Sequence, residues 1–268
     1  MLSNYLRLAA RLTAVVELRL LLKLGFNGGY RAVRSVQLHK RRLRCGRFFP
    51  PFLFISVTNR CNLCCQGCWV DVTGPPHDLP PELLDRTIRE ARRAGNSLFG
   101  ILGGEPFLYP HLFEVLERHT GAYFLVFTNG HFVSDKAARR MRQLGNVSPL
   151  ISIEGLERVS EERRGRPDVW RRTMAGLQRC VRYGLLTGVC TSLCKNNLAE
   201  LLTERWLDRL IELGVAYVWY YLYRPVGPQP RPELALSAAE QRAVRQFIVH
   251  MRTCKPIVIL DTYFDDRG

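Results

Sequence analysis

The chain has 268 residues, enough for one large domain with an extension, and its formal net charge of +15 favours acidic partners such as nucleic acid, anionic lipid or an acidic protein. Nine cysteines, four of them clustered, argue against a secreted disulfide scaffold and favour a reducing cytoplasm. No secretory signal is evident, and no uncharged apolar run approaches the roughly 18 residues that a membrane span needs.

The first predicted element is a helix over residues 2–24. Apolar residues recur along it at helical spacing, at Leu6, Ala9, Leu12, Val16, Leu20 and Leu24. Basic residues lie on its other faces, so it could lie on an anionic membrane surface, but we favour a helix packed on the rest of the chain. Gly25, Gly28 and Gly29 are predicted to end it. The basic stretch 39–47 is predicted to be a solvated linker, with an RNA or lipid contact as the alternative.

After Pro50 and Pro51, strand-like and helix-like runs alternate. The strand-like runs cover residues 52–57, 98–102, 123–127, 150–153, 187–193 and 216–222. The helix-like runs cover about 80–94, 110–120, 134–144, 167–183 and 199–213, with another near 238–252. This alternation predicts βαβ units and a parallel sheet. Six strands suit a partial (β/α)6 barrel, in which catalytic groups lie at the carboxyl ends of the strands.

The most informative stretch is residues 58–69, which follows the first predicted strand and carries four cysteines. Two sets of three ligands are open: Cys61, Cys65 and Cys68, or Cys61, Cys64 and Cys68. Either set could hold one face of a metal cluster and leave one metal without a protein ligand. A structural zinc site needs a fourth ligand, and no second Cys-x2-Cys or His pair supplies it. A zinc loop, or buried thiols acting as small apolar groups, is the alternative.

The first of these spacings resembles the cluster loop of the radical S-adenosylmethionine (SAM) superfamily. Three later stretches follow in the order typical of that family: Gly103-Gly104-Glu105-Pro106, Thr128-Asn129-Gly130, and Ser152-Ile153-Glu154-Gly155 with Arg164-Gly165 after it. The resemblance covers roughly residues 50–225. It implies an α/β fold, a partial (β/α)6 TIM-like barrel with an N-terminal helical extension.

The resemblance also implies the cofactors and the chemistry. A [4Fe-4S] cluster would be held by Cys61, Cys65 and Cys68, with Cys64 as the spare thiol. SAM would bind the open iron, and its reductive cleavage would give a 5′-deoxyadenosyl radical that abstracts a hydrogen from the substrate. The cofactors supply this chemistry, while the protein supplies position and shelter from water.

A set of SAM contacts follows from the same resemblance. It comprises Gly103, Gly104, Glu105, Pro106, Asn129, Ser152, Glu154 and Arg164. A carboxylate such as Glu105 complements the SAM ammonium, and the Arg164 guanidinium matches the SAM carboxylate, with Arg163 as a rival. The family usually has an aromatic residue just before the last cysteine to stack on adenine. Gly67 departs from that pattern, so either Trp69 takes the place or adenine is held in another way.

Other residues at the strand ends carry weaker expectations. Cys190 and Cys194, at the end of the fifth predicted strand, are expected to be core or loop thiols, with auxiliary ligation as the alternative. Tyr223 and Arg224 end the sixth strand and are candidate substrate contacts. Three segments are expected: a basic N-terminal helix and linker at 1–49, the core barrel at 50–225, and a Pro-rich loop, closing helix and truncated C-terminal segment at 226–268.

The expected partners are SAM, an unidentified substrate and an electron donor. The substrate could be a peptide, a lipid-linked molecule or a small molecule. An acidic flavodoxin- or ferredoxin-like donor would dock on the basic surface, and an anionic membrane is a candidate peripheral contact. The rival hypotheses are a non-catalytic iron–sulfur or zinc protein that binds RNA, and a barrel enzyme with structural zinc. The first of these leaves Gly-Gly-Glu-Pro unexplained, and the second predicts zinc with no iron or sulfide in protein purified without oxygen. Nucleic acid is not an expected partner of the enzyme.

Overall fold

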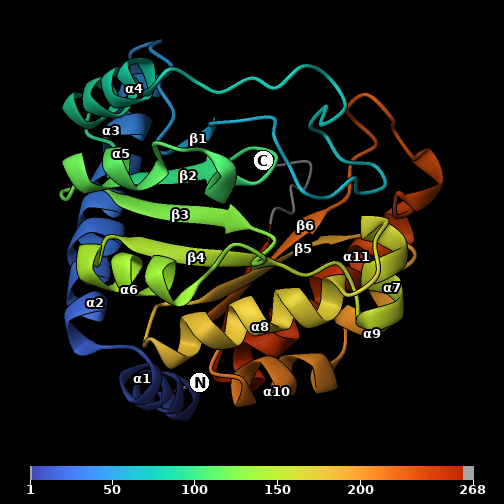
Figure 1. Ribbon diagram of the computed structural model, residues 1–268. Helices are drawn as coiled ribbons and strands as arrows, with labels where there is room; N and C mark the ends of the chain where they lie inside the picture. Colours follow the sequence, from blue (N-terminus) through green and yellow to red (C-terminus); the bar gives the residue numbers. More distant parts are fainter. Residues whose placement is uncertain (1, 262–268) are drawn as a thin grey trace.

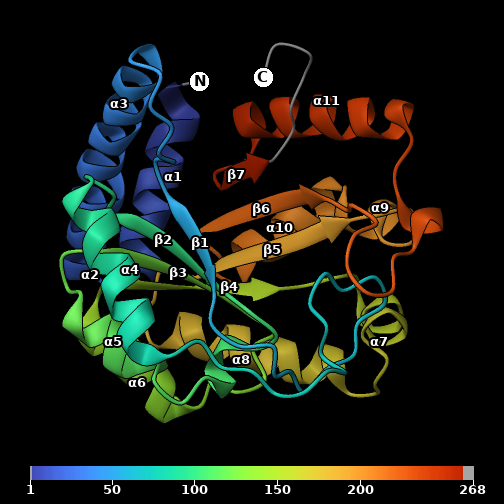
Figure 2. The same ribbon diagram turned by 90° about the horizontal axis from the view of Figure 1, so that it is seen from above.

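A computed structural model describes residues 2–261 and shows one sheet of seven parallel strands in the order β1 to β7 (Figure 1). The strands are β1 (Leu53–Ser56), β2 (Leu98–Leu102), β3 (Tyr123–Thr128), β4 (Val147–Ser152), β5 (Gly188–Leu193), β6 (Tyr217–Leu222) and β7 (Val258–Asp261). Neighbours in the sheet are neighbours in the chain, so every connection is a crossover of the βαβ type. The sheet curves into a half-barrel whose helices lie on the outside (Figure 2).

The crossover helices begin and end at recognisable signals. They are α4 (Pro81–Arg93), α5 (Leu112–Arg118), α6 (Asp135–Leu144), α7 (Glu157–Arg164), α8 (Val169–Arg182), α9 (Leu198–Leu201), α10 (Glu204–Glu212) and α11 (Ala238–Cys254), with short 3-10 turns at Pro106–Leu108 and Pro232–Leu234. Ser134 accepts from Ala137 N at the start of α6, and left-handed Gly145 ends it. A capping box of Ser237 and Glu240 starts α11.

The fold class is confirmed, and the barrel has one strand more than predicted. All six predicted strands are present within three residues of their predicted bounds. The additional strand, β7, has only four residues, too few to show a pattern. Helix α7 was missed because its sequence, ERVSEERR, is almost entirely charged, and the predicted helix over 199–213 is divided into α9 and α10.

The prediction of one helix ended by glycines is wrong. Residues 2–44 form α1 (Leu2–Val15), α2 (Leu18–Lys23), a π-helical segment (Leu24–Tyr30) and α3 (Arg31–Arg44), which we call the N-terminal strap. The three glycines lie within the π-helical segment, whose wider turns let the chain continue as a helix. The predicted linker over 39–47 is therefore helical as far as Arg44.

The strap crosses the amino ends of the strands (Figures 1 and 2). Val16 and Leu20 are buried in the core, and Leu12 and Leu24 pack against it, so most of the predicted apolar stripe faces the barrel. Basic side chains of the strap, Arg19 among them, donate to carbonyls at helix ends and in the loops that enter the strands. Other such pairs are Arg42 with Ala94 O at 2.7 Å, Arg31 with Gly121 O at 2.9 Å, Lys23 with Leu144 O at 2.6 Å and Arg11 with Pro256 O at 2.8 Å. Part of the basic charge thus satisfies carbonyls that helix ends leave open.

In the part of the chain that the structure describes, no helix combines the length and apolar character that crossing a bilayer requires.

Candidate cluster and cofactor site

The cysteine loop, residues 57–80, follows β1 and lies over the carboxyl ends of the strands (Figure 1). A bridge between Thr58 and Asp78 closes its base, and Thr58 Oγ1 donates to Asp78 at 2.6 Å. The Arg60 guanidinium donates to both oxygens of Asp78, at 3.2 and 2.7 Å. Bidentate pairing of this kind fixes direction as well as distance, so the two ends of the loop are held together.

Three of the four clustered thiols face one cavity. Cys61, Cys65 and Cys68 line it, whereas Cys64 is exposed and lies outside the lining. Burial raises the pKa of the Cys65 thiol to about 12, and burial also raises the pKa values of Cys61 and Cys68. Within residues 2–261, no three His, Cys, Asp or Glu side chains are grouped so that they could hold one metal ion.

The turn after β2 carries Gly103 and Gly104, which also line the cavity. Gly104 N donates to Thr58 O at 2.7 Å, and Glu105 N donates to Arg60 O at 2.7 Å. A Cβ at Gly104 would lie 2.3 Å from Arg60 O. Only glycine therefore allows this turn to pack against the start of the cysteine loop.

The side chain of Glu105 does not reach the cavity. It is fully buried, and its oxygens accept hydrogen bonds from Thr128 Oγ1 at 2.7 Å, Asn129 N at 2.8 Å and Phe107 N at 3.1 Å. Glu105 thus ties the end of β2 to the end of β3. Pro106, which begins the following 3-10 turn, is also buried outside the lining.

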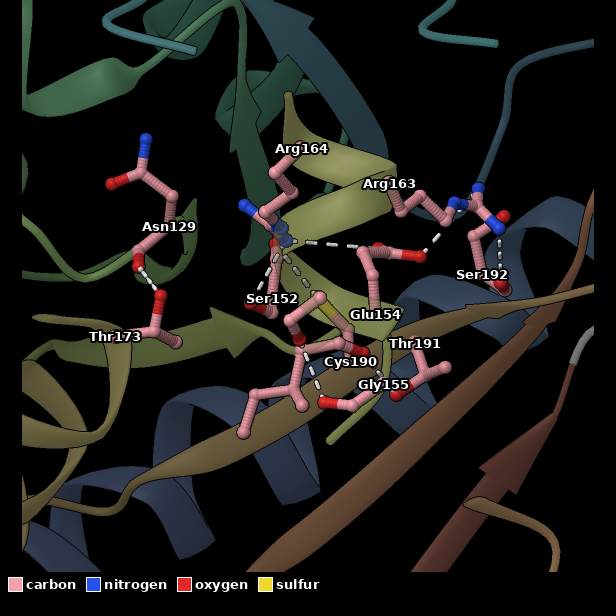
Figure 3. Close-up of polar contacts among 12 residues, drawn as sticks. Asn129, Ser152, Glu154, Gly155, Arg163, Arg164, Thr173, Cys190, Thr191 and Ser192 are labelled. Carbon is pink, nitrogen blue, oxygen red and sulfur yellow. Dashed lines mark hydrogen bonds and ion pairs between the residues drawn. The ribbon is translucent and has the colours of Figure 1, made fainter. Parts of the chain in front are cut away.

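A closed ring of hydrogen bonds joins the cysteine loop to β3 and α8. Asn129 Nδ2 donates to Asn62 Oδ1 at 2.8 Å, and Asn62 Nδ2 donates to His131 Nδ1 at 3.0 Å. His131 Nε2 lies 3.3 Å from Thr173 Oγ1. Thr173 Oγ1 in turn donates to Asn129 O at 3.0 Å, a contact drawn in Figure 3. The ring is satisfied when His131 is neutral and carries its proton on Nε2. Burial lowers the pKa of His131 to about 4, in agreement with this form.

The end of β4 meets the end of α7 in a cluster of charges (Figure 3). Arg164 Nη2 donates to Ser152 O at 2.9 Å and lies 3.8 Å from the Glu154 carboxylate. Arg163 lies 3.6 Å from the other oxygen of Glu154. Neither pair is at hydrogen-bond distance, and Glu154 Oε2 and Arg163 Nε are buried without a hydrogen-bond partner among the described residues. Buried polar atoms are normally satisfied, so these atoms are available to a ligand.

Gly67 lies next to the ring of Tyr223. Its φ of 66° is in the left-handed region, and a Cβ there would lie 2.2 Å from Tyr223 Oη. The hydroxyl accepts from Arg231 N at 3.1 Å, and the Arg163 guanidinium lies 5.3 Å from the ring centroid. Tyr223 therefore occupies the space beside residue 67, while Trp69 also lines the cavity.

The cavity has a volume of about 570 Å³, within the usual range for small-molecule sites. Its inner wall is aromatic, formed by Phe54, Phe127 and Tyr221. The Tyr221 ring stacks on Trp219 with centroids 5.0 Å apart. Tyr221 Oη and Trp219 Nε1 are buried without a hydrogen-bond partner among residues 4–261.

The structure gathers most of the predicted site residues on this cavity. Gly103, Gly104, Asn129, Ser152, Glu154, Arg164 and the three cysteines line it, and Glu105 and Pro106 do not. The candidate substrate contacts Tyr223 and Arg224 line it as well. Sequence reasoning missed the contribution of Phe54 and Phe127 to the cavity wall and the cavity position of Cys190, whose thiol lies 3.3 Å from Ser152 Oγ.

The chain matches the family model of the Radical SAM superfamily over residues 55–203, more than half of its length. It therefore belongs to the radical SAM superfamily, an enzyme class that uses a [4Fe-4S] cluster and SAM. This membership confirms the predicted resemblance, the enzyme class and the cofactors of the class.

Relatives within the superfamily differ in what their names say they make. The chain is 27% identical over 204 residues to the AdoMet-dependent heme synthase of Methanosarcina barkeri, covering 74% of this chain and 58% of the relative. It is 33% identical over 204 residues to the GTP 3′,8-cyclase of a Synechococcus species, covering 72% and 49%. SuiB of Streptococcus suis, solved bound to S-adenosylmethionine, superposes with a TM-score of 0.71 at 17% identity, covering 88% of this chain and 56% of SuiB. The chain spans about half the length of these relatives.

Proposed function

We propose that the chain binds a [4Fe-4S] cluster through Cys61, Cys65 and Cys68 and cleaves SAM reductively, so that a 5′-deoxyadenosyl radical abstracts a hydrogen from a substrate. The observation that carries this proposal is that these three thiols, and not Cys64, lie on the wall of one cavity. Superfamily membership supports the same chemistry.

The cavity residues could bind SAM with one change to the predicted set of contacts, which concerns Glu105. Arg164 is fixed by the Ser152 carbonyl at 2.9 Å and can pair with the SAM carboxylate. The unpartnered oxygen of Glu154 can accept from an ammonium group. Glu105 acts as a positioning residue, because both of its oxygens are already engaged. The Gly103–Gly104 backbone stays open to the ligand.

Single cysteine substitutions test the cluster assignment. In anaerobically reconstituted protein given SAM and dithionite, Cys61→Ala, Cys65→Ala and Cys68→Ala should each lose 5′-deoxyadenosine formation, because each removes a cluster ligand. Cys64→Ala is the matched control and should keep both the activity and the iron content. Loss of activity in Cys64→Ala with retention in Cys65→Ala would overturn the assignment.

The substrate is proposed only as a class. Relatives include enzymes named for heme and GTP chemistry and a maturation protein of a sporulation killing factor. Among peptides, lipid-linked molecules and small molecules, the aromatic wall favours one with an apolar or planar portion, and Tyr221 Oη offers it one hydrogen bond. Transfer of deuterium from a labelled candidate into 5′-deoxyadenosine would identify the substrate, and absence of transfer would reject that candidate.

An acidic flavodoxin- or ferredoxin-like protein in a reducing cytoplasm is the proposed electron donor. The net charge of +15 supports such docking through complementary potential. Turnover driven by flavodoxin should fall steeply with salt, because salt screens exposed charges, whereas turnover driven by dithionite should change little. Equal salt dependence with both reductants would contradict charge-guided docking.

The RNA-binding alternative is not favoured. The chain belongs to an enzyme superfamily, and its Gly103–Gly104 turn packs against the cysteine loop as the catalytic proposal requires. A peripheral contact with an anionic membrane also stays a proposal, and the surface of the strap bears on it.

A further inference from the structure

The outer surface of the N-terminal strap exposes large apolar side chains. Leu18, Leu22, Phe26, Tyr30 and Val33 are between 53% and 66% exposed. They recur every three or four residues through α2, the π-helical segment and α3, so they form one stripe along the helical surface. Of the nineteen exposed large apolar side chains among the described residues, ten lie between residues 5 and 48. Such a concentration marks an interaction surface more often than chance exposure.

A basic cluster continues the stripe toward the end of α3. Its exposed members are Arg34, Lys40, Arg41, Arg44 and Arg47. Residues 1–49 hold eleven lysines and arginines and one acidic residue, Glu17, so they carry a formal charge of +10 of the +15 in the chain. Glu17 is paired with Arg19 and Arg142, at 3.4 and 2.6 Å. Between residues 4 and 261, no acidic side chain forms an ion pair with any member of the basic cluster.

The stripe and the basic cluster meet at a shallow hollow on α3 of about 320 Å³. Tyr30 and Val33 contribute apolar side chains to its lining, and Arg34 and Arg41 contribute basic ones. A ligand that fits there combines an apolar part with an anionic part. Phospholipids at the surface of a bilayer have this composition.

This surface is not the stripe that the sequence indicated. Val16 and Leu20 of that stripe are buried against the barrel, so the strap has an inner apolar face for the core and a second, outer one. The basic residues of the strap also form two groups. Arg11, Lys23, Arg31 and Arg42 donate to barrel carbonyls, whereas the residues of the basic cluster do not. Packing against the barrel therefore does not explain why the outer face carries apolar and basic side chains.

We propose that the outer face of the strap, comprising the apolar stripe and the basic cluster, binds the surface of an anionic lipid bilayer. The apolar side chains would enter the interface, and the basic cluster would contact the anionic head groups. RNA would match the charge but would leave the aliphatic side chains of Leu18 and Leu22 without a partner. The inference is independent of the proposed catalytic function, since binding to vesicles requires no turnover of SAM.

Co-sedimentation of the full chain with vesicles tests the proposal. Vesicles of phosphatidylcholine with 30% phosphatidylglycerol should bind the protein in low salt, and pure phosphatidylcholine should bind it far less. The triple variant Arg34→Gln, Lys40→Gln, Arg41→Gln should bind about 100-fold more weakly, at about fivefold for each charge. The triple variant Leu18→Ser, Leu22→Ser, Tyr30→Ser should bind at least about tenfold more weakly.

A matched control removes the same charge from elsewhere on the molecule. The triple variant Arg139→Gln, Arg205→Gln, Arg242→Gln, with exposed arginines of α6, α10 and α11, should bind vesicles like the wild type. Equal weakening in this control would mean that net charge alone drives binding, and the proposal would fail. It would also fail if wild-type protein ignored anionic vesicles, or if RNA competed equally well with the wild type and the serine variant.

Depth-dependent quenching provides a second readout. Tryptophan at Leu22→Trp should be quenched by brominated lipid in anionic vesicles, whereas tryptophan at Val249→Trp, an exposed apolar site on α11, should not. A stable dimer that the serine variant converts to monomer would show that a second copy covers the face and would overturn the lipid assignment.

Discussion

At the scale of single residues, Gly67 and Tyr223 depend on one another. The sequence showed only that an aromatic residue was missing before the last cysteine, and the structure places Tyr223, from the end of β6, beside that position. No local pattern could show this, because the two residues are 156 positions apart and meet only when the half-barrel forms. The roles of Gly103 and Gly104 were easier to predict, because glycine has no Cβ and lets another group approach its backbone closely.

A side chain at residue 67 should therefore destabilise the protein through Tyr223. Gly67→Ala should cost about 2–3 kcal/mol in urea unfolding, because its Cβ would overlap the tyrosine hydroxyl and its φ is positive. In a Tyr223→Ala background the same change should lower the free energy of unfolding by only about 1 kcal/mol, because only the cost of a positive φ at a residue with a Cβ remains. Equal costs in both backgrounds would show that the two residues are not coupled.

At the scale of elements, the hydrogen-bonded ring of Asn62, Asn129, His131 and Thr173 connects the cysteine loop, the end of β3 and α8. Asn129 was expected at this site from the family resemblance, as a SAM contact, but the participation of His131 and Thr173 was not predicted. Their roles depend on how α8 packs over the sheet, which periodicity does not specify. The strap shows the same limit: its helical character was predicted, but its continuation through three glycines was not.

The ring predicts a loss of stability in mild acid. The pKa of His131 is lowered to about 4 in the folded chain from an ordinary value of 6.5, so the unfolded chain binds the proton more readily. The stabilisation from neutral His131 is complete above pH 6.5 and is lost as the pH falls toward 4. Between pH 7 and 5, the urea midpoint should fall more in the wild type than in His131→Gln. Parallel curves would contradict a role for this histidine.

At the scale of the whole molecule, the parallel half-barrel was predictable from the alternation of strands and helices. The position of the motifs at one edge of the sheet was also predictable, because each motif follows the carboxyl end of a strand. The shape of the cavity was not, because it depends on which inward-facing side chains of distant strands meet, such as Phe54 and Trp219 with centroids 6.1 Å apart. The division of the strap into an inner and an outer face was also hidden, since both faces carry apolar and basic residues.

The strap and the cavity lie at opposite ends of the strands (Figures 1 and 2). Strands of six residues span about 20 Å, so a molecule held flat by the strap would turn its catalytic mouth toward the aqueous side, at least that far above the lipid. A reductant diffusing in solution could reach the mouth directly. A substrate group attached to a lipid would need a linker at least as long as the barrel is high in order to reach the cavity.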